Sequence, residues 1–400
     1  MAKEYSTAKR MLAVVFVLLL FLGFIKNDPG SQLDRLSAYL KETKAETAGP
    51  AAVRSLETSY CSRIWNKSAL VDINGFMAKL EGRRGLYSDM GMYLTKDRYI
   101  VSVYPPTSTD YEYEQLVDFR DFLGENGVEM LYVNEPVKYT DDSVIRREFG
   151  VESYTNRNMD RFLARIREAG VHTIDLRENM AAEGIAATDL FYRTDHHWTV
   201  PAGLWAARNI ARGLNDYCGY DVDLSVYDRE KYTAKVWQKC WLGEQGRKIG
   251  RACVGLDDFT RLAPAFETSY RFKLNDGSTV AGTFDDFIDD RVLDPGNEIY
   301  STSWHYSYSA RSCINTRVKN GKILLLGDSY DYVMMPFLSL SAHETDFLIT
   351  RALDPDFKLR EFILKNGYDT VVLAYAQFML GAHDDGPSSN ANYRMFSLGS

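Results

Sequence analysis

A serine near the C-terminal end of the chain lies where an α/β sheet usually binds its ligand. The segment Lys322-Ile-Leu-Leu-Leu-Gly327-Asp328-Ser329-Tyr330 has the pattern of a buried strand that runs into a turn of small residues and then a helix. Backbone amides at the start of such a helix can stabilise an oxyanion next to Ser329. Asp and Ser are also favoured helix caps, so the segment by itself is compatible with a plain turn as well.

A second segment supplies the groups that a serine nucleophile requires. It is Tyr192-Arg193-Thr194-Asp195-His196-His197-Trp198-Thr199, and it holds two of the six histidines. A serine hydroxyl is activated by a base that a carboxylate holds in one tautomer. In an extended loop Asp195 and His197 point the same way and His196 points away from Asp195, so we predict His197 as the base. The alternatives are a metal-binding histidine pair, which lacks a third ligand nearby, and a capping Asp beside surface histidines.

Helices and strands alternate along most of the chain and must position both segments. Continuous apolar runs alternating with helices are typical of a parallel sheet covered on both faces. We predict strands at 128–134, 171–176, 322–327, 346–350 and 370–375, and helices at 111–124, 158–169, 201–214, 332–339 and 358–365. The fold class is therefore α/β.

Composition divides the rest of the chain into further parts. Residues 31–65 are polar with leucines at helical spacing, which indicates a stalk, and the main domain is expected over 66–380. Within it, 217–320 is rich in aromatic residues, Gly and Asp, with hairpin signals at 275–277 and 294–296, and we predict a β-rich insertion. Residues 381–400 are polar, so we expect a flexible tail.

The first thirty residues predict a membrane anchor. Lys3, Lys9 and Arg10 precede an uninterrupted apolar run from Met11 to Ile25. As a helix this run spans roughly 22 Å, short of a hydrocarbon core of about 30 Å, and snorkelling of the flanking basic side chains closes part of the gap. The small-x-small site of a cleaved signal peptide is missing, so an uncleaved transmembrane helix is favoured over a secreted product. The positive-inside rule places the remaining chain outside the cytoplasm.

Charge and cysteine content exclude some classes of function. The net charge is -8 and no basic run occurs, which argues against a nucleic-acid partner. The five cysteines have neither CxxC pairs nor zinc-like spacing, so we expect no metal and no cofactor, and the disulfide state is left open.

Together the two motifs resemble the DHHW family, relatives of the AlgX/AlgJ alginate O-acetyltransferases with an SGNH-hydrolase-like fold. The resemblance covers roughly residues 70–378 and implies that Asp195 is the acid, His197 the base and Ser329 the nucleophile. SGNH enzymes usually run from serine to histidine, and here the order is reversed. The resemblance therefore implies a three-layer, circularly permuted sheet, in which strand 322–327 is the first block and strands 128–134 and 171–176 are the last.

One part of the family pattern is missing. After strand 370–375 the sequence is Ala-Gln377-Phe instead of Gly-x-Asn-Asp, so the oxyanion donor must come from elsewhere. The candidates are the backbone N–H of Tyr330, Tyr375 and Gln377. Arg193 either positions an anionic sugar or pairs with an acid, and Trp198 is expected to pack beneath its loop.

The resemblance implies an extracytoplasmic O-acetyltransferase that acts on a cell-surface or exported polysaccharide. Acetyl-CoA is absent outside the cytoplasm, so a membrane-bound O-acyltransferase is the implied acetyl donor. A carbohydrate esterase or deacetylase would use the same triad with water as the acceptor. A non-catalytic, glycan-binding component of an export complex is the alternative from another class.

Overall fold

The computed structural model describes residues 67–87, 91–274, 276–288, 312–381 and 391–399. The chain divides into two compact units between Asn74 and Gly75, within helix α4 (Lys67–Leu80), and the sheet belongs to the second unit. The predicted anchor at 1–30, the stalk at 31–65 and the hairpin signal at 294–296 lie outside the described residues. Within the described ranges, no helix combines the length and the apolar character that crossing a membrane requires.

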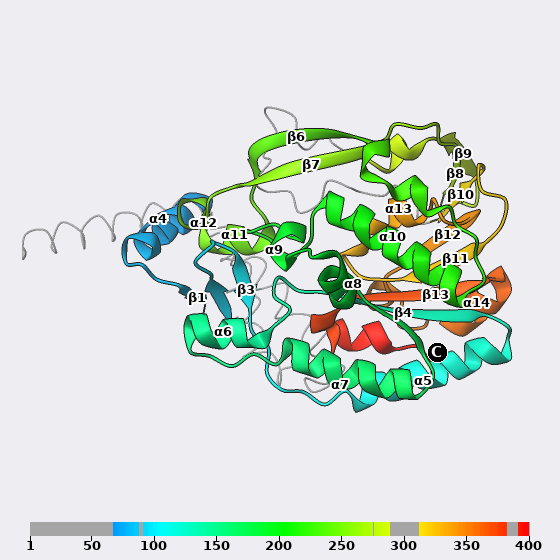
Figure 1. Cartoon of the computed structure of the whole chain (residues 1–400), viewed down its shortest axis with the longest axis horizontal. Coiled ribbons are helices and arrows are strands. Elements are labelled where there is room, and N and C mark those ends of the chain that lie inside the picture. The colour runs from blue at the N-terminus through cyan, green and yellow to red at the C-terminus, as the bar shows by residue number, and fades with distance from the viewer. Residues whose placement is uncertain (1–66, 88–90, 275, 289–311, 382–390, 400) are drawn as a thin grey trace, which may run out of the picture. The chain divides into compact units, whose positions relative to one another are not determined.

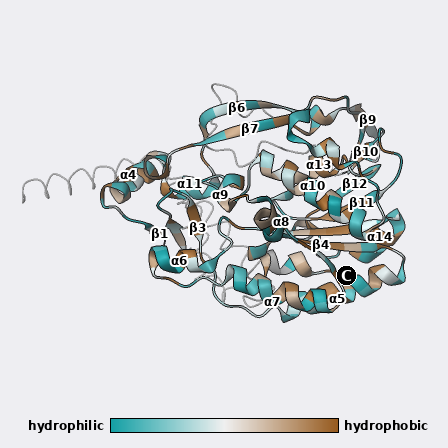
Figure 2. Cartoon of the chain, in the orientation of Figure 1, coloured by the Kyte–Doolittle hydropathy of each residue, from teal (hydrophilic) through white to brown (hydrophobic). Residues whose placement is uncertain are grey.

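An eight-stranded sheet forms the centre of the second unit (Figure 1). Five adjacent strands are parallel, in the order β5 (His172–Asp175), β4 (Glu129–Glu135), β13 (Thr370–Ala376), β11 (Lys322–Leu326) and β12 (Glu344–Leu348). All seven residues of β13 are buried. Figure 2 shows hydrophobic residues concentrated along these central strands. The predicted α/β class with a parallel-rich sheet is confirmed, because strands buried on both faces read as continuous apolar runs.

Helices cover both faces of this sheet. They are α5 (Asp110–Glu125), α7 (Thr155–Glu168), α8 (Leu176–Glu183), α10 (Val200–Tyr217), α13 (Asp331–Leu338) and α14 (Leu359–Asn366). Two shorter helices are α6 (Asp142–Phe149), whose Ile145 packs in a separate cluster with Val101, and α9 (Ala187–Leu190). Neighbouring residues of a strand point to opposite faces. On β4, Tyr132 packs against Phe162 of α7, whereas Leu131 lies next to Gly213 of α10. Helices α7 and α10 therefore lie on opposite faces.

The predicted elements agree with the observed ones to within a few residues. The largest differences are three residues, at the start of α7 and at the end of α10. At the end of β5 the predicted strand continued to residue 176. Asp175 instead caps α8, because its side chain accepts a hydrogen bond from the backbone N–H of Arg177. The permutation interpretation requires the strand at 128–134 to join the C-terminal strands in one sheet, and β4 does pair in parallel with β13.

The segment 217–320 contributes to the main sheet as well as to a separate ribbon. Strands β6 (Tyr232–Trp241) and β7 (Asp257–Pro264) form a long antiparallel ribbon, and the short helices α11 (Glu244–Ile249) and α12 (Arg251–Val254) connect them. Strands β10 (Ser312–Asn315), β8 (Tyr270–Lys273) and β9 (Thr279–Gly282) extend the sheet beyond β12 in antiparallel fashion. The segment 217–320 thus contains many strands, but those of its second half belong to the eight-stranded sheet. A further antiparallel sheet is formed by β1 (Gly85–Tyr87), β2 (Met92–Leu94) and β3 (Ile100–Ser102).

The end of the chain is packed, which corrects the expectation of a flexible tail for its described part. Met395, Phe396 and Leu398 are buried, and the ring of Phe396 lies between those of Phe162 and Tyr375. The tail is polar on average, but these three apolar side chains bury it against the sheet.

Candidate active site

Asp195, His197 and Ser329 form one chain of hydrogen bonds. Nδ1 of His197 lies 2.6 Å from Oδ1 of Asp195, and Nε2 of His197 lies 2.8 Å from Oγ of Ser329. A carboxylate can only accept, so the proton of the neutral ring is on Nδ1 and Nε2 is left to accept the proton of the serine hydroxyl. The structure therefore brings together the three residues that the two distant motifs predicted, in the geometry that nucleophile activation requires.

The serine turn is held by buried carboxylates. The side chain of Asp328 accepts hydrogen bonds from the backbone N–H of Tyr330, at 2.7 Å, and of Ala376, at 2.9 Å. The carboxylate of Asp331, in the first turn of α13, accepts from the backbone N–H of Asp328 at 2.8 Å. Any side chain at Gly327 would collide with Asp331, so this position needs glycine. These bonds join the turn after β11 to the end of β13 and place Ser329 above both strands.

The loop that carries the acid and the base is held by the first residue of β7 and by the segment between β6 and β7. The carboxylate of Asp257 accepts from both the backbone N–H and the hydroxyl of Thr194, at 2.8 and 2.7 Å. The backbone N–H of Glu244 donates to Oδ2 of Asp195 at 2.7 Å. A Cβ at Gly243 would collide with Asp195, so only glycine permits this approach. Local sequence carries no signal for these contacts, since the partners are 63 and 49 residues apart.

Trp198 packs beneath the loop, as expected. Its side chain is fully buried, and its indole N–H donates to the backbone oxygen of Tyr330 at 2.8 Å. This bond connects the histidine segment directly to the serine segment.

The environment keeps Asp195 ionised. Burial would raise the pKa of this carboxyl, but the charge and hydrogen bond of His197, together with the charge of His196 and the Glu244 N–H, hold the pKa below its usual range. An ionised Asp195 can orient the imidazole of His197 and stabilise its cation.

His196 is not where strand alternation placed it. Its Nδ1 lies 3.4 Å from Oδ1 of Asp195, and its ring centroid lies 3.7 Å from that of His197. The loop is therefore more tightly curved than an extended strand. Burial and the charge of His197 lower the pKa of His196, so this ring is neutral near pH 7. Ser329 contacts His197, not His196, which supports the predicted choice of base.

The four oxyanion and substrate candidates are engaged elsewhere. The N–H of Tyr330 donates to Asp328, the hydroxyl of Tyr375 to the backbone oxygen of Met395, and the amide of Gln377 to Asn156. Arg193 binds Asp257 and the backbone oxygen of Leu256, which is the acid-pairing alternative. β13 ends at Ala376, and the chain then turns Gln377 into the interior. The prediction that these groups face the substrate is therefore corrected.

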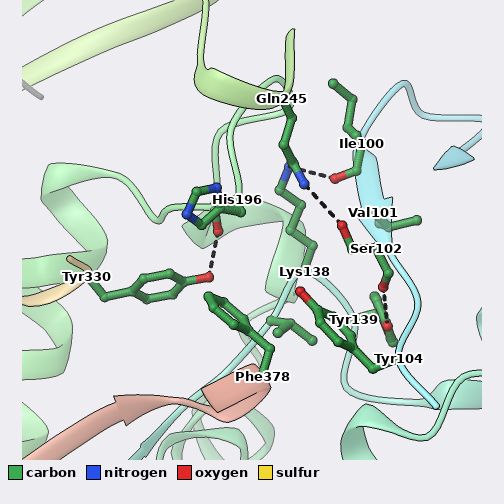
Figure 3. A pocket seen from close by; sticks show the side chains of 11 residues that line it. Ile100, Val101, Ser102, Tyr104, Lys138, Tyr139, His196, Gln245, Tyr330 and Phe378 are labelled. Atoms are coloured by element: carbon green, nitrogen blue, oxygen red, sulfur yellow. Dashed lines mark hydrogen bonds between the residues drawn. The ribbon is translucent and has the colours of Figure 1, made fainter. Parts of the chain in front are cut away.

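A small cavity opens next to the histidine pair (Figure 3). Its volume is about 30 Å³. Aromatic side chains of Tyr104, Tyr330 and Phe378 form its walls together with His196, and the hydroxyl of Tyr330 donates to the backbone oxygen of His196. Lys138 and Gln245 line the same cavity and are buried.

Two groups of side chains in the described residues have ligand-type atoms within 4.8 Å of one another. One is Asp195 with the two histidines, whose atoms already form the hydrogen-bonded chain. The other is Glu135, Asp328 and Asp331, all fully buried below the serine turn. Burial, and then the charge of the neighbouring carboxylates, raise the pKa of Glu135 well above its usual range, and the same causes act on Asp331. We therefore expect Glu135 and Asp331 to retain a proton near pH 7.

This proton predicts the sign of a pH effect on stability. Where the native state holds a proton that the unfolded chain has lost, the free energy of unfolding falls as pH rises, by about 1.4 kcal/mol per pH unit and proton. We expect this decline between the unfolded pKa of Glu, about 4.3, and the raised native value. Glu135→Gln should make the free energy of unfolding less dependent on pH and raise it at pH 8. Urea unfolding from pH 5.5 to 8.5 measures both effects.

The matched control is Glu129→Gln, which changes an exposed residue of the same strand and should leave the pH dependence intact. If the free energy of unfolding instead rises with pH and drops on addition of EDTA, the carboxyl groups do not retain a proton and bind a cation.

One family model matches part of the chain. Residues 92–236 match the family model described as SGNH hydrolase-like domain, acetyltransferase AlgX. The matched stretch contains Asp195 and His197 and ends before Ser329. No curated protein matches the chain in sequence.

Solved structures share the fold. PatB1 of Bacillus cereus, determined with a sulfonyl adduct, is 18% identical with a TM-score of 0.57, and the match covers 76% of this chain and 99% of PatB1. A DHHW family protein from Eubacterium siraeum is 16% identical with a TM-score of 0.53, and the match covers 72% of this chain and 90% of that protein. At such identities the likeness establishes the fold alone. Residues 92–236 thus resemble an AlgX-type SGNH hydrolase-like domain, and the fold resembles that of a DHHW family protein, which agrees with the resemblance that the two motifs indicated.

Proposed function

We propose that this protein is a serine O-acetyltransferase that moves an acetyl group onto a polysaccharide outside the cytoplasm. The observation that carries the proposal is the chain of hydrogen bonds from Asp195 through His197 to Ser329, at 2.6 and 2.8 Å. The match to a family model named for an acetyltransferase supports acyl transfer as the reaction type.

The reaction has two halves that share one base. Nε2 of His197 takes the proton of Ser329 while Oγ attacks the carbonyl carbon of the acetyl donor. The tetrahedral intermediate collapses, the leaving group receives the proton from His197, and acetyl-serine remains. His197 then takes the proton of a sugar hydroxyl, whose oxygen attacks the acetyl carbon. Ser329 leaves and recovers its proton from His197. Asp195 stabilises the imidazolium in both halves.

The setting of the reaction follows from the N-terminal sequence. The apolar run at 11–25 would tether the domain to the outer face of a membrane. A membrane-bound O-acyltransferase in that membrane would deliver the acetyl group, and the acceptor would be a cell-surface or exported glycan. No soluble cofactor takes part in this scheme.

One experiment separates transfer from hydrolysis. The full chain in detergent is incubated with an aryl acetate, with and without oligosaccharides, beside Ser329→Ala. Acetylated sugar that is absent with the variant supports transfer, whereas free acetate as the only product identifies an esterase. A sulfonyl fluoride should modify Ser329, as detected by mass spectrometry of the peptide; the sulfonyl adduct of PatB1 makes this reagent a suitable probe. Turnover that is equal in wild type and Ser329→Ala would refute the enzymatic proposal.

A further inference from the structure

A buried lysine connects the segments on either side of Asp195. Lys138 follows β4, and only 7% of it is exposed. Its Nζ donates to the backbone oxygen of Ile100 at 2.7 Å (Figure 3). It also donates to the backbone oxygen of Arg193 at 3.1 Å and to Oε1 of Gln245 at 3.2 Å. An ammonium group has three donors, so all of them are used.

Two of these acceptors belong to the segments that hold Asp195. Arg193 lies two residues before Asp195 in the same loop. Gln245 directly follows Glu244, whose backbone N–H donates to Oδ2 of Asp195. The ammonium group of Lys138 therefore joins the loop that carries Asp195 to α11. The first residue of α11, Glu244, in turn contacts Oδ2 of Asp195.

This lysine is costly to bury. In the described ranges, no carboxylate oxygen lies within ion-pair distance of its Nζ, and its three partners are neutral oxygens. Burial lowers the pKa of Lys138 to about 7, although the charges of Asp195 and Asp257 act in the opposite direction. A neutral side chain of similar length would avoid this desolvation cost but would remove a donor from three buried oxygens, of which that of Arg193 also accepts from the backbone N–H of Ile100 at 2.9 Å.

We propose that Lys138 is a positioning residue of the triad, which holds the Arg193 carbonyl and the Gln245 side chain and thereby fixes Asp195 against His197. The inference rests on the proposed function of that triad. Loss of the ammonium proton leaves two donors for three acceptors, so the positioning weakens as pH rises through about 7. The titratable and charged groups around the lysine are Asp195, His196, Arg193, Glu244, Asp257, Tyr104, Tyr139 and Tyr330.

The neighbours with shifted pKa values are not expected to change their charge near pH 7. The pKa of Asp195 and that of His196 are lowered, and those of the three tyrosines are raised by burial. The guanidinium of Arg193 is turned to Asp257. An alkaline loss of activity with a midpoint near 7 is therefore expected to report on Lys138.

The test compares wild type with Lys138→Met in aryl acetate hydrolysis from pH 5.5 to 9. We expect kcat to fall at least tenfold with KM nearly unchanged, and the alkaline decline of the wild type to be absent from the variant. The rate at which a sulfonyl fluoride modifies Ser329 should fall by a similar factor. Lys365→Met, at an exposed position of α14, is the matched control and should behave as wild type.

A second variant keeps the test decisive if Lys138→Met does not fold. Gln245→Leu removes one acceptor and leaves the charge in place, and it should lower kcat less and shift the alkaline midpoint. If folded Lys138→Met has the kcat of wild type and the same alkaline decline in activity, the inference is wrong. The proposed function would still stand if Ser329→Ala has lost turnover. If wild type itself shows no serine-dependent turnover, the proposed function fails and the inference with it.

Discussion

Replacing His197 with alanine should lower serine-dependent hydrolysis of an aryl acetate by about 10⁴-fold or more, because the base that is hydrogen-bonded to Ser329 is lost. His196→Ala is the matched control. Its ring packs against that of His197 at a tilt and lies near Asp195, but the hydrogen bond to the serine comes from His197, so most of the activity should be retained. The measurement is kcat/KM for both variants at a pH where wild type is most active.

A double variant tests whether the two residues act as one unit. Ser329→Ala with His197→Ala should be no less active than Ser329→Ala alone, because residues that serve the same step have strongly non-additive effects. Losses that multiply in the double variant would show that His197 acts elsewhere. A large loss in His196→Ala, with His197→Ala nearly active, would reverse the assignment of the base.

Asp195→Asn should lower kcat by about 10⁴-fold while the fold is kept, because the asparagine imposes the wrong imidazole tautomer. Both oxygens of Asp195 accept N–H groups: Oδ1 from the ring and backbone of His197, and Oδ2 from Glu244. An amide has a single oxygen, so one of these donors must face an NH₂ group. If the NH₂ group faces the ring, Nε2 carries the proton and cannot accept that of Ser329.

The control for the lost charge is Asp216→Asn, an exposed position in the last turn of α10, which should leave kcat unchanged. Thermal unfolding of both variants separates misfolding from loss of chemistry. If Asp195→Asn retains near wild-type kcat with an intact fold, Asp195 does not orient the base and the triad is reduced to a dyad.

Local sequence was sufficient for the elements of the sheet and for half of the site. Apolar runs predicted the parallel strands because a strand buried on both faces is mostly apolar, although β4 also buries Asn134 and Glu135. Asp195 and His197 were predictable as a pair because they are two residues apart in one loop. Ser329 was predictable as a nucleophile because glycine and small polar residues follow an apolar strand. Its partnership with His197, 132 residues away, came from the resemblance of both motifs to one family.

Only the tertiary structure decided what surrounds the triad. Asp257 and Glu244 hold the acid loop from the insertion, and Lys138 joins them from the end of β4. Gln377 faces the interior instead of the serine.

The physical reason is the range of each effect. Propensity, capping and periodicity depend on residues within about one or two turns of the chain, so they can be read from sequence. Which buried donor meets which acceptor depends on how the elements pack, and no spacing along this sequence encodes that. The sequence by itself therefore determined the strands, the helices and the acid–base pair, and only the packed structure decided which groups orient them.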